Sequence, residues 1–277
     1  NENYIQSPLT GVVSNDGVYF ENKGKIESLD IGVKITSGSN QYSGHFKNSG
    51  IIDSSNNAVL FNGADNVLEL SGGSDIKGKI DGGSGENILI VNGNISLNNS
   101  EVNNFNKLIV SGDTVIDGVI NLNPSVNNDY YTQSFSNVKD LSQISSETHV
   151  GKLTVKGTVN IGVDYDNISS ETDKTGKIIT NSLTMLNGGK VVLINKGGTT
   201  DNLITEAQKS GEKDRISIKS IIISNKQQAV NPDFKFSVSS ELETLDGWKR
   251  DTVSRIENGV TVMDEIYAVR HEGRSRK

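Results

Sequence analysis

The sequence is first informative through what it lacks. Its 277 residues contain no cysteine, which excludes disulfide bonds, thiol catalysis and cysteine-ligated zinc sites. Prolines number three and aromatic residues make up 5%, whereas a single compact core of this length normally draws on more aromatic and leucine-rich sequence. No run of 18 apolar residues occurs, so no segment is suited to cross a bilayer as a helix.

Positive charge is also scarce. The net charge is −7, and no arginine occurs before Arg215. This balance argues against nucleic acid and anionic lipid as partners. Only the last eight residues, 270–277, are locally basic, and they are typical of a solvated tail or linker. The N-terminus has neither a start methionine nor a signal-peptide pattern, so we expect a processed or excised piece of a longer chain.

A short phrase recurs in the first half of the chain. Residues 66–72, 87–93 and 106–112 all read N-x-L-x-[L/V]-[S/N]-G, with leucines 21 and then 19 residues apart. A repeat of about 20 residues, each holding a short strand closed by a turn, is typical of a chain wound into a stacked coil. The phrase therefore predicts an elongated parallel β-solenoid.

A second repeat lies upstream. Residues 20–35 align without a gap on residues 46–61 and share the pattern F-x-N-x-G-x-I. Apolar residues alternate with polar ones, as in strands with one face in a core. The asparagine and glycine suit corners, because both tolerate the left-handed backbone of tight turns. Disorder is the competing interpretation of a polar, glycine-rich chain, and this regular alternation argues against it.

The repeats predict how most of the chain is organised. We expect stacked rungs over residues 1–200, with polar excursions near 123–150 and 164–177. The rungs resume at KLTVKG, residues 152–157, and at SLTMLNG, residues 182–188.

The C-terminal part has a different texture. Within residues 201–277, longer strands are predicted at 216–223, 234–238 and 260–267. An open solenoid end exposes unpaired strand edges, so we interpret this part as a β-rich cap followed by the basic tail. The only tryptophan, Trp248, follows an Asp-Gly turn dipeptide and is the expected anchor of the cap.

At this point a family resemblance emerges. The pattern F-x-N-x-G-x-I, then GKIDGGSGENILI at 78–90 and NFNKLIV at 104–110, resembles the passenger domain of a Gram-negative type V autotransporter. LDGWKR at 245–250, continuing through Val269, is similar to the C-terminal autochaperone region of such passengers. The resemblance implies a right-handed parallel β-helix, export across the outer membrane to the cell surface, and a translocator barrel of the full-length protein as a partner.

The sequence contains only weak candidates for a metal site. Residues 81–87 partly match a calcium nonapeptide, but the match occurs once and Asn87 stands at an aspartate position, so a coil corner is favoured. The histidines His45, His149 and His271 have no second histidine at metal-ligand spacing, and we expect them to be solvated at the surface. The sequence predicts no metal and no cofactor.

Carboxylates raise an enzymatic alternative. Parallel β-helices include polysaccharide-degrading enzymes, in which paired carboxylates act on a glycosidic bond. The candidate carboxylates along the coil are Asp53, Asp75, Asp81, Asp113 and Asp117. Aspartate is also common in corners for turn reasons alone, so a non-enzymatic function is favoured.

Two functions follow from the sequence. In the first, the chain is an adhesin or virulence passenger that contacts a host-cell or bacterial surface receptor, with Tyr130 and Tyr131 as candidate contacts because aromatic residues are enriched in recognition. These tyrosines could equally pack back onto the coil. In the second, the chain is a stalk with an autochaperone that displays another module, such as a subtilisin-like protease, N-terminal of residue 1.

Overall fold

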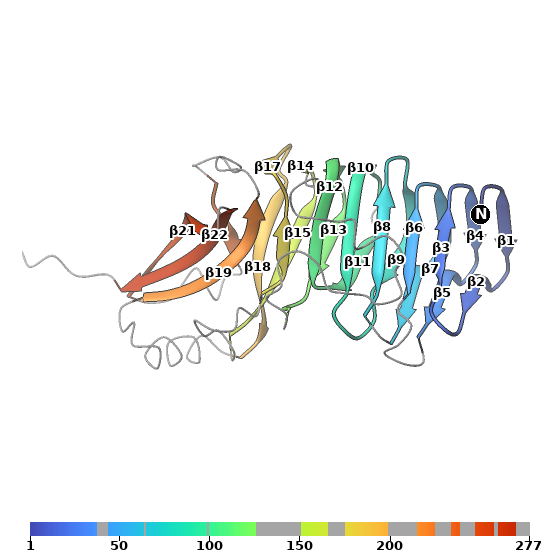
Figure 1. Ribbon diagram of the computed structural model, residues 1–277, viewed down its shortest axis with the longest axis horizontal. Helices are drawn as coiled ribbons and strands as arrows, with labels where there is room; N and C mark the ends of the chain where they lie inside the picture. The colour runs from blue at the N-terminus through green and yellow to red at the C-terminus, as the bar shows by residue number, and fades with distance from the viewer. Residues whose placement is uncertain are drawn as a thin grey trace, which may run out of the picture.

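The computed structural model describes residues 1–37, 44–63, 65–98, 100–125, 151–165, 175–198, 215–224, 234–238, 247–257 and 260–269. Every regular element in these residues is a β-strand, and the strands form two 11-stranded sheets along an elongated molecule (Figure 1). The prediction of an all-β chain is confirmed for this part. Over the same residues, no helix is long and apolar enough to cross a membrane.

The first sheet follows the order β1-β4-β7-β9-β11-β13-β15-β18-β20, with β2 beside β5 and β5 beside β7. Its strands are β1 (Tyr4–Ser7), β2 (Thr10–Ser14), β4 (Lys25–Ser28), β5 (Ile31–Thr36), β7 (Ile51–Asn62), β9 (Asp75–Asp81), β11 (Glu101–Phe105), β13 (Val119–Leu122), β15 (Thr158–Asp164), β18 (Lys190–Gly197) and β20 (Ser237–Val238).

The second sheet follows the order β21-β22-β19-β16-β12-β10-β8-β6-β3, with β14 beside β12 and β17 beside β14. Its strands are β3 (Tyr19–Asn22), β6 (His45–Asn48), β8 (Val67–Ser71), β10 (Ile88–Ile95), β12 (Lys107–Ile116), β14 (Lys152–Val155), β16 (Lys177–Ile179), β17 (Ser182–Met185), β19 (Arg215–Ser224), β21 (Trp248–Glu257) and β22 (Val260–Val269).

The chain visits the two sheets in turn, and each visit adds a strand beside the strand of the previous repeat. We call one such set of strands a layer; the first layer is β1, β2 and β3. Leu89 lies in register with Leu68 on one side and with Leu108 on the other. Phe20 likewise pairs with Phe46 in register. Both alignments made from the sequence repeats are therefore confirmed.

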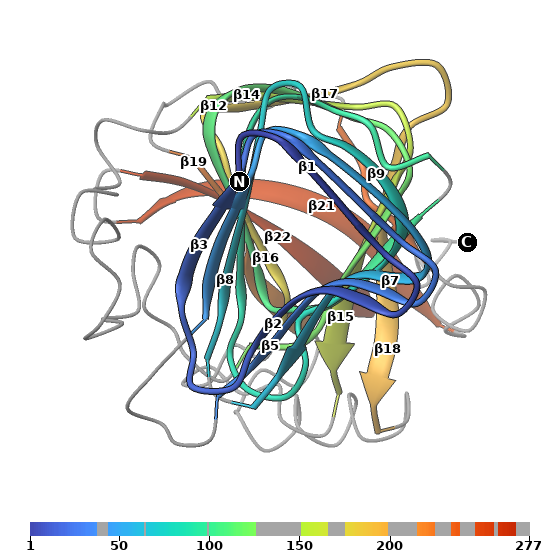
Figure 2. The same cartoon turned by 90° about the vertical axis from the view of Figure 1, so that its right-hand side faces the viewer.

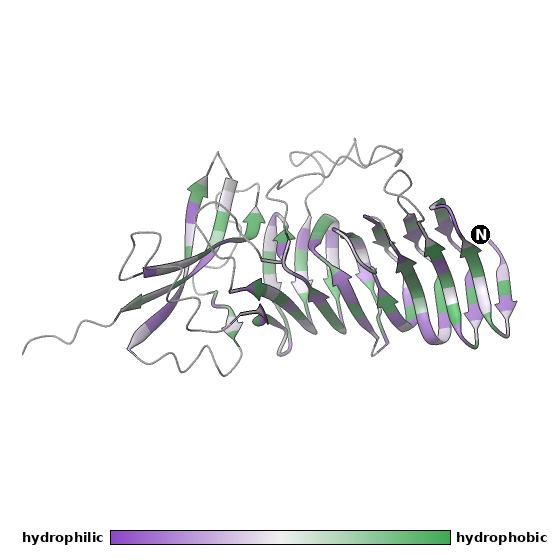
Figure 3. Ribbon diagram, turned by 90° about the horizontal axis from the view of Figure 1, so that it is seen from below, coloured by the Kyte–Doolittle hydropathy of each residue, from purple (hydrophilic) through white to green (hydrophobic). Residues whose placement is uncertain are grey.

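The apolar core lies between the two sheets. Viewed along the long axis, the strands enclose a common interior (Figure 2). Ile26, Ile52 and Ile76 follow one another in register on neighbouring strands, and all three are fully buried. Hydrophobic segments recur at corresponding places in neighbouring strands (Figure 3). Each such isoleucine contributes about 1.5–3 kcal/mol through burial.

The repeated asparagines have a role that differs from the expected one. Asn22 and Asn48 do not adopt the left-handed backbone, which among the non-glycine described residues occurs only at Asn98, Asn104 and Asn187. Instead the Asn22 Nδ2 donates a hydrogen bond of 2.8 Å to the Oδ1 of Asn48 in the next layer, and both side chains are buried. Asparagine recurs at this position of the repeat because its side chains form a ladder of hydrogen-bonded amides, and not because the position needs a turn conformation.

A second ladder explains the first residue of the N-x-L phrase. The backbone N–H of Asn66 donates to Oδ1 of Asn87 at 2.8 Å, and the backbone N–H of Asn87 donates to Oδ1 of Asn106, also at 2.8 Å. All three side chains are buried. Each side-chain amide oxygen thus accepts a hydrogen bond from a backbone N–H of the layer before it. Such a partner is needed because a buried backbone N–H without an acceptor is costly.

The repeated glycines of the upstream pattern mark close backbone approach. A Cβ atom at Gly50 would lie 2.1 Å from the carbonyl oxygen of Gly24 in the previous layer. Neither residue has a positive φ. Steric crowding between layers therefore explains glycine at these positions, and no left-handed conformation is involved.

The stack is less regular in its middle. The first part of β12, Lys107–Ile109, pairs with β16, whereas its end, Thr114–Ile116, pairs with β14. Leu153 of β14 pairs in turn with Leu183 of β17, which confirms the two later repeats as neighbours. Most of the two expected excursions, residues 126–150 and 166–174, lies outside the described residues.

Strand direction changes at the C-terminal end. Every pairing among the named strands is parallel until β19, which pairs with β16 in parallel and with β22 in antiparallel orientation. β21 then pairs with β22, also antiparallel, and forms the outer edge of the second sheet. We call β19, β21 and β22 the C-terminal antiparallel unit.

Candidate functional site

The predicted site residues are only partly within the described residues. Tyr130, Tyr131, His149 and His271 lie outside them. Trp248 begins β21 after Gly247, whose φ of +79° is the turn conformation that glycine adopts easily. Its side chain is partly buried and packs against the hydrophobic core.

The C-terminal antiparallel unit encloses a polar cluster that the sequence did not reveal. Glu265 of β22 is fully buried. Its carboxylate accepts one hydrogen bond from Nη1 of Arg250 at 2.9 Å and another from the hydroxyl of Thr252 at 2.8 Å. Both donors come from β21, where Thr252 stands directly opposite Glu265 in the register. The cluster therefore fastens β21 to β22 beyond their backbone ladder.

The same cluster reaches a third segment. Nη1 of Arg250 also donates to the carbonyl oxygen of Phe236 at 2.8 Å, and the backbone N–H of Phe236 donates to Oγ1 of Thr252 at 3.1 Å. Phe236 is buried and immediately precedes β20, the last strand of the first sheet. These bonds hold the ends of the two sheets together.

Burial sets the protonation of this cluster. Desolvation raises the pKa of Glu265 to about 7, against the opposing effect of the bonds from Thr252 and Arg250. Burial also raises the pKa of Tyr267, with the nearby Glu265 and Tyr165 adding to the shift. Among the described residues, the buried Tyr267 hydroxyl finds no hydrogen-bond partner. A carboxyl group that titrates near neutral pH thus lies at the junction of the two sheets.

Two ion pairs accompany this cluster, one partly buried and one exposed. Nε of Arg255 on β21 lies 2.6 Å from the Asp264 carboxylate on β22, and the Asp264 side chain is only 4% exposed. Lys235 forms an ion pair with Asp251. One feature of the sequence could have indicated this cluster. Asp264 and Glu265 are adjacent acidic residues inside a predicted strand that is otherwise mostly apolar.

The expectation of solvated histidines is wrong for His45. Its side chain is 5% exposed, and it lies in β6 between Tyr19 and Val67 of the neighbouring layers. The ring meets that of Tyr19 edge to face at 5.0 Å, and its Nε2 is 3.6 Å from the Glu69 carboxylate. Burial opposes ionisation of Glu69, yet the contact with His45 and the charge of Lys47 hold its pKa below the usual value. In-register stacking between the neighbouring layers therefore buries this histidine.

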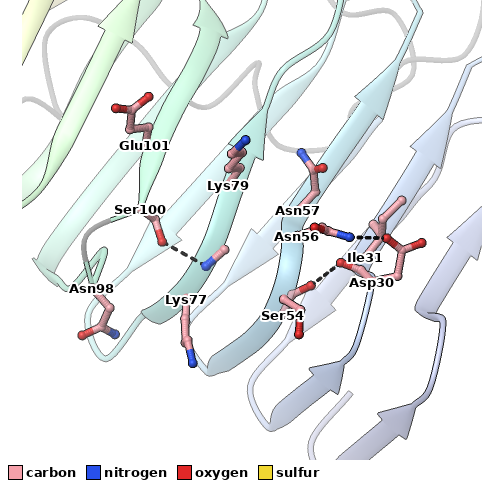
Figure 4. A pocket seen from close by; sticks show the side chains of 12 residues that line it. Asp30, Ile31, Ser54, Asn56, Asn57, Lys77, Lys79, Asn98, Ser100 and Glu101 are labelled. Carbon is pink, nitrogen blue, oxygen red and sulfur yellow. Dashed lines mark hydrogen bonds between the residues drawn. The ribbon is translucent and has the colours of Figure 1, made fainter.

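A polar groove of about 890 Å³ crosses four layers of the first sheet (Figure 4). Much of its lining is engaged in bonds between layers. Nδ2 of Asn56 donates to Oδ1 of Asp30 at 2.7 Å, and the backbone N–H of Gly78 donates to Oγ of Ser100 at 3.0 Å. Lys79 and Glu101 also line the groove and are exposed.

The carboxylates considered for catalysis do not converge in this groove. Asp81, Asp113 and Asp117 each accept a backbone hydrogen bond, from Gly83, Lys152 and Leu97 respectively. These bonds lie at turns or between neighbouring layers, as expected of corner aspartates.

The partial calcium motif is likewise built into the fold. Oδ1 of Asp81 accepts from the Gly83 N–H and from Nδ2 of Asn104, while the Asn87 amide belongs to the second ladder. Within the described ranges, no group of three or more His, Cys, Asp or Glu side chains could hold a metal ion.

Of the two candidate regions, the C-terminal antiparallel unit is the more distinctive. It combines a change of strand direction, a buried carboxyl group held by two donors, and contacts to both sheets. Comparison with known proteins assigns no family, since no family model, curated protein or solved structure matches this chain.

Proposed function

We propose that residues 1–200 form a right-handed parallel β-helix and that the chain is the exported passenger segment of a cell-surface protein. In this proposal the β-helix is an adhesin or virulence-factor stalk, and the C-terminal antiparallel unit acts as an autochaperone that templates its folding. The observation that carries the proposal is the change from parallel to antiparallel pairing at β19 and β22.

The parallel layers need a template to fold efficiently. Residues paired in neighbouring layers are 19 to 26 positions apart in the regular part of the stack, as in Leu89 with Leu108 and Phe20 with Phe46, and Lys107 pairs with Lys177 across 70 positions. Pairings between such distant residues form slowly, because the entropy of closing a long loop is lost before any contact forms. A preformed edge at one end removes this barrier for the next layer, and folding can then propagate.

The C-terminal antiparallel unit has the properties of such a template. Its β21 and β22 pair along their whole length, down to Glu257 opposite Val260, three positions further along the chain. Local antiparallel pairing forms faster than the distant parallel pairing of the stack. The unit then offers Ile222 and Ile223 of β19 as the edge on which β16 adds.

Direction matters for export. If the C-terminal end folds first outside the cell, each added layer holds the chain on the outside and draws the next segment outward. A translocator barrel in the full-length protein would supply the passage. The stalk role suits the described residues because the polar side chains of the groove are largely engaged in bonds between layers. Receptor contact through Tyr130 and Tyr131 stays a prediction.

The test is the order in which strands become protected during refolding. The chain is diluted from denaturant, and its amides are labelled at successive times by pulsed hydrogen exchange. We expect protection first in β19, β21 and β22, then in β16 and β12, and last in β1 to β3. Earlier protection of the N-terminal layers, or simultaneous protection throughout, would sink the template role.

A matched pair of variants sharpens the test. Thr252→Val removes one donor to Glu265 in the unit, and Thr114→Val removes a buried hydroxyl in the parallel stack. The first change is expected to slow protection of every layer, whereas the second is expected to slow only layers N-terminal of β12. Equal effects would contradict folding from the C-terminal end.

A further inference from the structure

The polar groove of the first sheet contains a row of three polar side chains on neighbouring strands. Asn57 of β7 pairs in register with Lys79 of β9. Glu101 of β11 lies beside Lys79, because the next residues of the two strands, Val102 and Ile80, pair with each other. All three side chains line the groove (Figure 4). Neighbouring strands are about 4.8 Å apart, so the row presents one polar group at each such step.

The fold makes no use of these three side chains. Across the part of the chain that the structure describes, none of them forms a hydrogen bond or an ion pair. Lys79 and Glu101 are exposed, and Asn57 is partly exposed. By contrast, the hydroxyl of Ser54 in the same groove donates to the carbonyl oxygen of Asp30 at 2.6 Å and so joins two layers. The row is therefore available to a ligand.

The charges of the groove favour a neutral ligand. The lining contains two lysines, Lys77 and Lys79, and two acidic residues, Asp30 and Glu101. Neither sign is in excess, as recognition of a charged ligand requires. The net charge of the whole chain is −7, which disfavours a polyanion such as nucleic acid or an acidic polysaccharide.

The row combines hydrogen-bond donors and acceptors. The Lys79 ammonium donates, the Glu101 carboxylate accepts, and the Asn57 amide does both. A hydroxyl group also donates and accepts, so a ligand rich in hydroxyl groups can bond to every member of the row. A peptide gains less, because its backbone binds at open strand edges and β9 is already paired on both sides, with β7 and β11. These groups therefore suit a sugar better than a peptide.

The groove is long enough for several sugars. Its volume is about 890 Å³, and it crosses four layers of the stack. In an extended β-1,4-linked chain, each sugar advances by nearly one strand spacing. Such a chain, lying across the strands, brings successive sugars to successive members of the row.

We propose that this groove binds a neutral, linear, β-1,4-linked polysaccharide along the axis of the stack. Lys79 donates to its hydroxyl groups, Glu101 accepts from them, and Asn57 does both. The proposed event is binding alone, without cleavage. It does not depend on export, on folding order or on receptor contact through Tyr130 and Tyr131.

Affinity electrophoresis in native gels tests the proposal. The whole chain migrates because of its net charge of −7, and a neutral polysaccharide cast into the gel retards it through binding. The probe is glucomannan, which is neutral, linear and β-1,4-linked. We expect it to retard the chain relative to an acidic reference protein that does not bind sugars. Dextran, which is neutral but 1,6-linked, is expected to retard the chain much less.

A double variant that keeps the net charge locates the binding. Lys79→Ala with Glu101→Ala removes one charge of each sign, and the net charge stays at −7. The glucomannan concentration for half-maximal retardation should rise about tenfold, because two hydrogen bonds to the ligand are lost. Glu2→Ala with Lys23→Ala is the matched control. It removes an exposed ion pair of 3.9 Å outside the groove and should bind like the native chain.

Lysine acetylation, measured by mass spectrometry, provides an independent position for the ligand. Bound glucomannan should slow the acetylation of Lys79 and leave unchanged that of the exposed Lys152, which belongs to β14 in the second sheet. Circular dichroism and urea unfolding establish that each variant is folded.

Four results would overturn the proposal. The first is the absence of retardation by glucomannan, and the second is equal retardation by dextran, which would show that the strand spacing does not select the ligand. The third is a folded double variant that binds as tightly as the native chain. The fourth is retardation without protection of Lys79, which would place the binding elsewhere on the chain.

Discussion

The two ends of the strand stack are built differently. In the described structure, the first layer consists of parallel strands with almost no charge and several exposed apolar side chains. The C-terminal end reverses strand direction, carries charge on its outer strand and buries Glu265 between Arg250 and Thr252. A parallel stack has no intrinsic stop, because each layer offers the same edge to the next. The C-terminal antiparallel unit departs from that pattern, because its strands reverse direction.

The largest expected effect compares burial in an inner layer and in the first layer. Ile5, Ile26, Ile52 and Ile76 occupy the same position in successive layers. Ile52→Ala should destabilise the chain by about 3–4 kcal/mol, because the site is fully buried between two neighbours. Ile5→Ala should cost about 1–2 kcal/mol, because Ile5 is only partly buried and no strand among the described residues covers its outer side. Urea unfolding measures both values, and equal losses would mean that the first layer is already fully packed.

The second prediction concerns how the stability contributed by Glu265, in the C-terminal antiparallel unit, depends on pH. Its pKa is raised from 4.5 to about 7 in the folded chain, so the stabilisation from holding it protonated is present below pH 4.5 and is lost as the pH rises through 7. Glu265→Gln removes this dependence. The stability of the native chain relative to the variant should fall by on the order of 3 kcal/mol between pH 4.5 and 8.

Denaturant unfolding at a series of pH values provides the measurement for Glu265. Glu101→Gln is the matched control, because Glu101 is exposed on β11. Its difference from the native chain should stay flat over the same range. A flat difference for Glu265→Gln as well would contradict a neutral carboxyl group at the junction of the sheets.

The third prediction concerns the amide ladders. Asn87→Ala leaves the buried N–H of Asn66 without its acceptor, which should cost about 2–3 kcal/mol. Asn121 belongs to a partly buried ladder, in which it donates to Asn103 and accepts from Asn160, both at 2.7 Å. Because water can replace those bonds, Asn121→Ala should cost about 0.5 kcal/mol. Thermal and urea unfolding measure the loss of stability in both variants. Equal losses would contradict the claim that burial makes the Asn87 ladder more stabilising than the Asn121 ladder.

Much of the fold could be predicted because parallel stacking places like residues beside like. The three leucines of the N-x-L phrase and the aligned pair Phe20 and Phe46 gave the strand register directly. The cause of the pattern was harder to infer. An asparagine in a left-handed corner and an asparagine in a buried ladder look the same in a sequence, and only the neighbouring layer distinguishes them.

The polar cluster could not be predicted because its partners lie on different strands. Glu265 and Arg250 are charged residues in a polar chain, and their burial depends on the register between β21 and β22. Strand β21 was not predicted from the sequence, because half of its residues are charged. His45 was assigned to the surface for a similar reason, although stacking between Tyr19 and Val67 buries it.

The fourth prediction tests the predicted cap anchor. Trp248 is only partly buried, so Trp248→Ala should cost about 1–2 kcal/mol, less than the 3–5 kcal/mol typical of a fully buried tryptophan. Trp248→Phe keeps an apolar ring against the core and should recover most of that loss. The kinetic consequence is the sharper criterion. If the C-terminal antiparallel unit forms early, Trp248→Ala slows refolding, whereas Ile5→Ala accelerates unfolding and leaves refolding nearly unchanged. Stopped-flow circular dichroism separates the two rates, and the reverse pattern would place the folding nucleus in the first layer.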